Sequence, residues 1–153
     1  MGGGGSTTCP PLALNRTPNN PKKRRNALEK LICDINRPYC TTGAGLTAFD
    51  AARAFYRDTL GLDAEDNALG ALNLKLPQGG IVFVYPKDNH EPASYTILNL
   101  EVADIDAAVD ELTAKGVEFA RYEGSYQDEK GIARGKAAHR GPDIAWFTDP
   151  AGN

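Results

Sequence analysis

The chain has 153 residues, of which 41% are hydrophobic, and a formal net charge of −3. This length suits one domain with a hydrophobic core and excludes two large domains. No apolar run approaches the roughly 18 residues that a membrane helix needs, and the N-terminus lacks the apolar block of a signal peptide. We therefore expect a soluble, cytoplasmic protein with no membrane partner.

Residues 1–40 differ in composition from the rest of the chain. They hold seven basic residues against two acidic ones, and they begin with a stretch rich in Gly, Pro, Asn and Thr. Such residues favour turns and bury little apolar area, so we predict a disordered basic segment, in which residues 26–35 could form a short amphipathic helix. The basic run Lys22–Arg25 is either a nucleic-acid or targeting patch or a solvated tail. Because the remainder of the chain is acidic and repels phosphate, we expect no nucleic-acid partner.

From residue 41 onward, the pattern indicates regular structure. Asp50–Leu60 has the apolar spacing of a helix, and Gly61 stands where a left-handed terminator is favoured. Alternating or continuous apolar runs then predict strands within residues 69–76 and 79–85. The same order returns in the second half, with a strand at 95–102, a helix at 105–115 ended by Gly116, and strands within 117–122 and 143–148.

Two stretches of the chain repeat each other. FDAARAFYRDTLGLD (49–63) and IDAAVDELTAKGVEF (105–119) share a hydrophobe-Asp-Ala-Ala start, a helical pattern and a closing Gly. We interpret this repeat as an internal duplication, in which each half reads strand, helix, then strands. The sequence therefore predicts an α+β fold of two small sheets whose helix-free faces enclose a cleft.

The strand at Tyr95–Val102 has two different faces. Leu98, Leu100 and Val102 share the face that suits packing beneath a helix. The other face combines aromatic, apolar, amide and carboxylate groups, namely Tyr95, Ile97, Asn99 and Glu101. That mixture fits either a cavity wall or an edge strand with one face in water.

Three further features could carry ligand contacts. Trp146 shares a strand face with Ile144 and Thr148, and it is either a core residue or a platform that stacks a flat ligand. The long polar stretch 121–135, with Tyr122 and Tyr126, is either the mouth of a cleft or a solvated connector. Glu101 is a general base if it is buried, and otherwise a solvated or ion-paired carboxylate.

Three motifs together resemble a known family. They are AARAFYRDTLGL (51–62), ADIDAAVDELTAKGV (103–117) and AWFTDPAGN (145–153), in this order. They are similar to the glyoxalase, bleomycin-resistance and extradiol-dioxygenase group, the vicinal oxygen chelate superfamily. The resemblance covers about residues 41–153 and implies two βαβββ modules, at about 41–88 and 94–153, with a cleft and often a homodimer.

The same resemblance points to two irregular strands. The first strand of the first module, at residues 39–47, contains two glycines and is expected to be weak. By the same resemblance, the final strand of the second module is expected to be missing, because its position falls after Asn153. Its absence would leave a sheet edge whose backbone groups need a partner chain, the N-terminal segment or water.

Metal-using members of this family place four ligands on the first and last strands of the two modules. By resemblance, the first-strand positions fall at Thr41 and Ile97, the strand at 81–85 has no carboxylate or imidazole, and the last position lies past Asn153. A hydroxyl is a poor ligand for a transition metal and an isoleucine is none, so we expect no metal and no cofactor. The alternative is a rebuilt site that uses Asp88, His90, Glu101 or His139.

The leading hypothesis is a metal-free small-molecule-binding protein that resembles drug-sequestering resistance proteins. Its ligand would lie on Tyr95, Asn99, Glu101 and Trp146, gated by residues 122–134 with Tyr122 and Tyr126. One alternative is a metal-dependent lyase or dioxygenase of the same superfamily. The other is a truncated, inactive family member.

Overall fold

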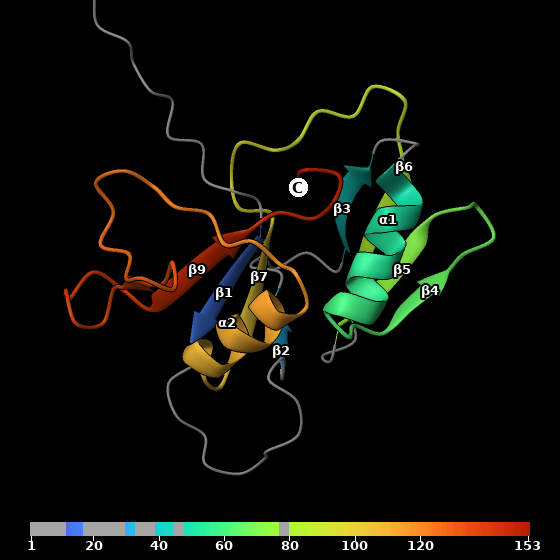
Figure 1. The fold of residues 1–153 in the computed structure, drawn as a ribbon. Helices are drawn as coiled ribbons and strands as arrows, with labels where there is room; N and C mark the ends of the chain where they lie inside the picture. Colours follow the sequence, from blue (N-terminus) through green and yellow to red (C-terminus); the bar gives the residue numbers. More distant parts are fainter. Residues whose placement is uncertain (1–11, 17–29, 33–38, 45–47, 77–79) are drawn as a thin grey trace, which may run out of the picture.

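The computed structural model describes residues 12–16, 30–32, 39–44, 48–76 and 80–153. These residues form two sheets with one helical segment against each (Figure 1). The predicted α+β architecture is therefore confirmed. In chain order the elements are β1 (Leu12–Arg16), β2 (Lys30–Ile32), β3 (Tyr39–Ala44), α1 (Phe49–Ala54), the π-helical turn η2 (Phe55–Thr59), β4 (Ala64–Asp66), β5 (Leu72–Lys75), β6 (Ile81–Pro86), β7 (Leu98–Val102), α2 (Ile105–Ala114), β8 (Ala133–Arg134) and β9 (Asp143–Phe147).

The four-stranded sheet, which we call sheet B, has the order β3-β6-β5-β4. Its outer strand β3 runs parallel to β6, and β6 runs antiparallel to β5. The predicted weak first strand is therefore present despite Gly43, because β3 pairs along its whole length with β6. Backbone hydrogen bonds to a central strand compensate for poor local strand preference.

The five-stranded sheet, sheet A, has the order β2-β7-β1-β9-β8. Strand β1 runs parallel to β7 and antiparallel to β9. It therefore holds the same place in sheet A that β6 holds in sheet B, between a parallel and an antiparallel neighbour. The sequence predicted an open edge in the second sheet, and in the structure the N-terminal strand β1 pairs with both β7 and β9 of that sheet.

This arrangement corrects two expectations about residues 1–40. Disorder is wrong for Leu12–Arg16, because the strand hydrogen-bonds on both sides and Leu12, Ala13 and Leu14 are fully buried. The helix expected at 26–35 is wrong at Lys30–Ile32, which form a strand antiparallel to β7. Apart from these strands and the start of β3, the segment lies outside the described residues.

Both predicted helices are present, and the first has an unexpected form. Helix α2 begins at the cap Asp104, whose carboxylate accepts hydrogen bonds from the backbone N–H groups of Asp106 and Ala107 at 3.1 and 3.2 Å. Gly116 follows its end with a φ of 88°. The first helix starts as α1, but from Phe55 it widens into the π-helical turn η2.

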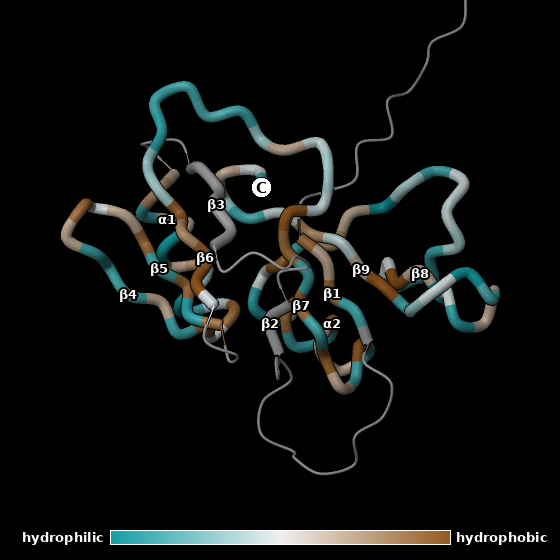
Figure 2. The backbone as a smooth tube through the Cα atoms, turned by 180° about the vertical axis from the view of Figure 1, so that it is seen from behind, coloured by the Kyte–Doolittle hydropathy of each residue, from teal (hydrophilic) through white to brown (hydrophobic). Residues whose placement is uncertain are grey.

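One hydrophobic core joins the two sheets and their helices. Alternate residues of β5, β6, β7, β1 and β9 point into it, and α2 packs on β1 and β9. Figure 2 shows hydrophobic segments along β6, β7 and β9, whereas the connection between β6 and β7 is largely hydrophilic. The predicted division of β7 is confirmed, because Leu98, Leu100 and Val102 are all buried. The opposite face of each sheet is therefore the one available for a site.

The C-terminal turn links the two halves of the fold. Asp149 is 4% exposed and accepts a hydrogen bond of 2.8 Å from the Tyr56 hydroxyl on η2. The same carboxylate accepts bonds from the backbone N–H groups of Ala151 and Asn153 at 2.9 and 2.8 Å. The DPAGN end of the chain therefore has a structural role in joining the second half to the first.

Candidate functional site

The face of sheet A that points away from α2 carries the polar residues. Strand register places Asn99, Ala13 and Trp146 in one row across β7, β1 and β9. It places Glu101, Asn15 and Ile144 in the next row. We call these two rows the inner face. Because Ala13 and Asn15 belong to them, β1 contributes to the candidate site as well as to the fold.

A cavity of about 470 Å³ lies where the inner face meets the loops before and after β8. This volume falls within the range of about 300–1,000 Å³ that is usual for small-molecule pockets. Ile144 and Trp146 form its floor on β9, and the opposite wall comes from the loops. The complete lining is Gly124, Ser125, Tyr126, Ala133, Arg134, Gly135, Ala138, Arg140, Pro142, Ile144 and Trp146.

Tyr122 and Gln127 shape one side of this cavity. The Tyr122 ring meets the Trp146 ring edge to face, with centroids 5.7 Å apart. The Gln127 side chain donates to the carbonyl oxygens of Ala120 and Gly131, both at 2.8 Å, and accepts from the Tyr122 N–H at 2.8 Å. One amide therefore fixes the loop that presents Tyr122 and Tyr126.

The loop between β8 and β9 forms the other side. Its Arg140 N–H donates to the Gly135 carbonyl at 2.8 Å, and the Arg140 guanidinium lies over the Tyr126 ring, 4.5 Å from its centroid. A Cβ at Gly135 would lie 2.3 Å from the Pro142 carbonyl oxygen, so the loop closes only around a glycine. His139 has a φ of 52°, a left-handed conformation that is uncommon for residues other than glycine but is adopted more often by histidine than by most.

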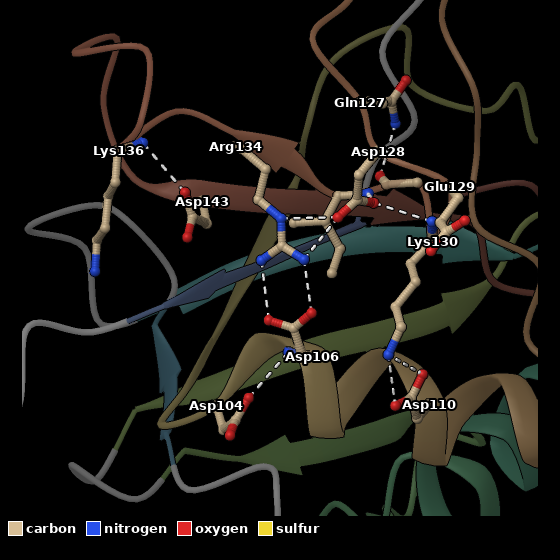
Figure 3. Close-up of polar contacts among 12 residues, drawn as sticks. Asp104, Asp106, Asp110, Gln127, Asp128, Glu129, Lys130, Arg134, Lys136 and Asp143 are labelled. Carbon is tan, nitrogen blue, oxygen red and sulfur yellow. Dashed lines mark hydrogen bonds and ion pairs between the residues drawn. The ribbon is translucent and has the colours of Figure 1, made fainter.

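Arg134 anchors the cavity to helix α2 (Figure 3). Its guanidinium donates two bonds to the Asp106 carboxylate, at 2.6 and 2.9 Å, and one to Asp128 at 2.7 Å. The bond to Asp106 raises the pKa of Arg134, although burial acts in the opposite direction. Lys130 pairs with Asp110, one turn further along α2, at 2.7 Å. The loop that carries Tyr126 is therefore tied to the helix by two ion pairs.

We predict that acid loosens this anchor through Asp128. Burial raises the pKa of this carboxyl group, but hydrogen bonds from the Ile132 N–H and from Arg134 outweigh burial and hold it below the ordinary value of 3.8. A lowered pKa stabilises the folded state fully above about pH 4, and that contribution is lost as pH falls through the folded-state value. The melting temperatures of the protein and of Asp128→Asn should therefore converge progressively as pH falls below about 4. A difference that stays constant over this range would contradict the assignment.

The structure places the six predicted ligand-binding residues unequally. Trp146 and Tyr126 line the cavity, and Tyr122 contacts Trp146. Asn99 and Glu101 both lie on the inner face of β7, two strands away from β9 and the cavity floor. Tyr95 precedes β7, is 67% exposed and does not line the cavity. Whether these residues bind a ligand is still a prediction.

Asn15 and Arg140 had no signal in the sequence, and Ile144 was predicted only to share a strand face with Trp146. Asn15 belongs to a segment whose composition favours disorder, and it donates to the Asn99 side-chain oxygen at 2.7 Å. Arg140 stands in a polar loop, and Ile144 is one apolar residue in a strand. Only the strand register and the loop closure bring them to the same site.

The donor set of the inner face does not fit the metal centre that the resemblance implies. It offers one carboxylate, Glu101, and two amides that hydrogen-bond to each other. Ile97 is apolar and packs against the core, and the part of the chain that the structure describes holds no cluster of three His, Cys, Asp or Glu side chains. His90 lies 3.1 Å from the Ala151 carbonyl, and His139 is exposed on its loop. Divalent transition metals need at least three good protein ligands.

No helix among the described residues is long and apolar enough to cross a membrane.

Comparisons with known proteins give two distantly similar solved structures and one matching family model. An integron cassette protein from the mobile metagenome of V. cholerae shares 16% identity over 80% of this chain and 93% of its own, with a TM-score of 0.46. A second, from V. pseudocholerae, also shares 16% identity, over 74% of this chain and 87% of its own, with a TM-score of 0.44. No curated protein matches the sequence. The family model of the glyoxalase/bleomycin resistance protein/dioxygenase superfamily matches residues 46–153, and the chain therefore belongs to this superfamily.

Proposed function

We propose that this protein binds a small, planar, largely apolar molecule without using a metal ion. The observation that carries the proposal is the cavity of about 470 Å³ whose floor is Ile144 and Trp146. A flat apolar ligand can stack on an indole and cover a neighbouring aliphatic side chain, and aromatic contacts of this kind are each worth about 0.5–1.5 kcal/mol beyond the area that they bury.

The surroundings of Trp146 support a binding role. Its ring is held edge-on by Tyr122, and the facing loops are fixed by Gln127 and by the ion pairs of Arg134. Such a site is largely formed before a ligand arrives, which reduces the entropy lost on binding. The metal-dependent lyase or dioxygenase is disfavoured, because the inner face supplies a single carboxylate and two amides.

The proposal also includes the location of the protein in the cell and its oligomeric state. We place the binding protein in the cytoplasm, with sequestration of its ligand as its activity. Light scattering on the purified chain distinguishes a monomer from the homodimer that is common in the superfamily.

The test uses Trp146, the only tryptophan of the chain, as the reporter. A panel of aromatic antibiotics, thiol conjugates and 2-oxo compounds is titrated while the tryptophan fluorescence is recorded, with and without EDTA. We expect at least one compound to change the fluorescence saturably, with a dissociation constant unaffected by the chelator. Calorimetry on the same compound provides the stoichiometry.

Two variants locate the binding. Ile144→Arg fills the cavity floor with a long charged side chain and should abolish binding, whereas Leu69→Arg, at a position 84% exposed and outside the cavity, should bind normally. Binding that survives Ile144→Arg, or that requires an added divalent metal, would overturn the proposal. A panel with no saturable response would also contradict it.

A further inference from the structure

We propose that the ligand carries an anionic group, in the manner of an aromatic carboxylate, and that Arg140 recognises it. This inference rests on the proposed function, because it specifies the ligand of the same cavity. Its basis is the charge of the lining, which contains two guanidinium groups, Arg134 and Arg140, and no carboxylate. A positive lining is the opposite of what the net charge of −3 would place at random on this surface.

The two arginines are not equivalent. Arg134 is already neutralised, because Asp106 and Asp128 accept bonds from all three of its guanidinium nitrogens. Arg140 forms no ion pair with any carboxylate among the described residues. Its charge is therefore available to a ligand, whereas that of Arg134 is used to hold the loop.

The position of Arg140 favours a planar anion. The guanidinium carbon of Arg140 lies over the Tyr126 ring, 4.5 Å from its centroid, and the guanidinium donates to no carboxylate or carbonyl oxygen among the described residues. A guanidinium edge pairs with a carboxylate through two parallel hydrogen bonds. Because the loop bond from the Arg140 N–H to Gly135 fixes the backbone, less freedom is lost when the pair forms.

The apolar floor then defines the rest of the ligand. Ile144 and Trp146 offer a flat hydrophobic surface, and Arg140 and Tyr126 belong to the loops above β9. A molecule with an aromatic body and an acidic group at one edge can contact the apolar floor and pair with Arg140 at the same time. A neutral molecule of the same shape would make the contacts with Ile144 and Trp146 but would not form an ion pair with Arg140.

The test compares two probes of equal shape, 2-naphthoate and 2-naphthamide, by isothermal titration calorimetry. We expect the carboxylate to bind about tenfold more tightly than the amide, since hydrogen bonds between charged partners are roughly twice as strong as neutral ones. Arg140→Gln should lower the affinity for 2-naphthoate by about tenfold and leave the affinity for 2-naphthamide unchanged. Arg140→Lys keeps the charge but not the paired N–H donors of the guanidinium. Its affinity for 2-naphthoate should lie between that of the unmodified protein and that of Arg140→Gln.

Lys136→Gln is the matched control, because Lys136 is an exposed cation of the same loop that does not line the cavity. It should bind both probes as the unmodified protein does. Equal affinity for the two probes, or an equal loss of both in Arg140→Gln, would overturn the inference and leave the proposed function standing. Failure of both probes and of the whole compound panel would instead refute the proposed function, and this inference with it.

Discussion

Replacing Leu14 with alanine is expected to lower the free energy of unfolding by about 2–5 kcal/mol, the usual cost of removing a buried leucine side chain. Leu14 is fully buried at the centre of β1, where the strand pairs with both β7 and β9. Since a domain of this size is stable by only about 5–15 kcal/mol, a large part of the total stability depends on this N-terminal strand. Urea denaturation followed by circular dichroism measures the effect.

The control is Leu69→Ala, at a leucine that is 84% exposed in a turn of sheet B, and it should change stability by less than about 0.5 kcal/mol. A more severe variant, Leu14→Asp, places a charge without a partner in the core and should leave the protein largely unfolded at room temperature. If Leu14→Ala proved as mild as Leu69→Ala, β1 would not be part of the folded core.

Asp149→Ala is expected to have an effect of similar size, although no ligand contact is involved. The buried Asp149 carboxylate accepts bonds from the Tyr56 hydroxyl and from the N–H groups of Ala151 and Asn153. A buried donor that loses its acceptor costs about 1–3 kcal/mol, so we expect a loss of at least about 2 kcal/mol. Thermal and urea unfolding should both report it.

Tyr56→Phe isolates one bond of this set, and it should cost about 1.5–3 kcal/mol because the acceptor is charged. The double variant should be less destabilised than the sum of the two single variants, since both remove the same contact. Asp58→Ala, at an exposed aspartate of η2, is the matched control and should be close to neutral. Fully additive effects would show that Tyr56 and Asp149 do not interact.

The buried Asp149 also gives a physical meaning to the motif that identifies the family. In F-x-DP-x-GN, the aspartate organises the terminal turn, and Gly152 adopts a φ of 85°. A Cβ at Gly152 would lie 2.9 Å from the Pro92 side chain, so the turn packs closely against the connection between β6 and β7. The motif therefore has a structural role in this chain.

Helix α2 and the division of β7 into two faces could be predicted from the sequence because their determinants are local. The cap Asp104, the terminator Gly116 and the apolar spacing between them all lie within one short stretch. The alternation of Leu98, Leu100 and Val102 likewise defines a buried face without reference to any partner. Trp146 and Tyr126 were found as candidates for the same reason, since their residue type alone marks them.

Strand β1 and the completed cavity were decided by the tertiary structure. The five residues of β1, between Pro11 and Thr17, have little strand preference of their own. The strand is stabilised by hydrogen bonds to strands that lie more than eighty positions away in sequence, as Asn15 and Asn99 illustrate. Arg140 and Ile144 approach Tyr126 only because the β8–β9 loop closes around Gly135. Helix caps and strand alternation act between neighbours and can be read along the chain, whereas the pairing of distant strands depends on the free energy of the whole packed core.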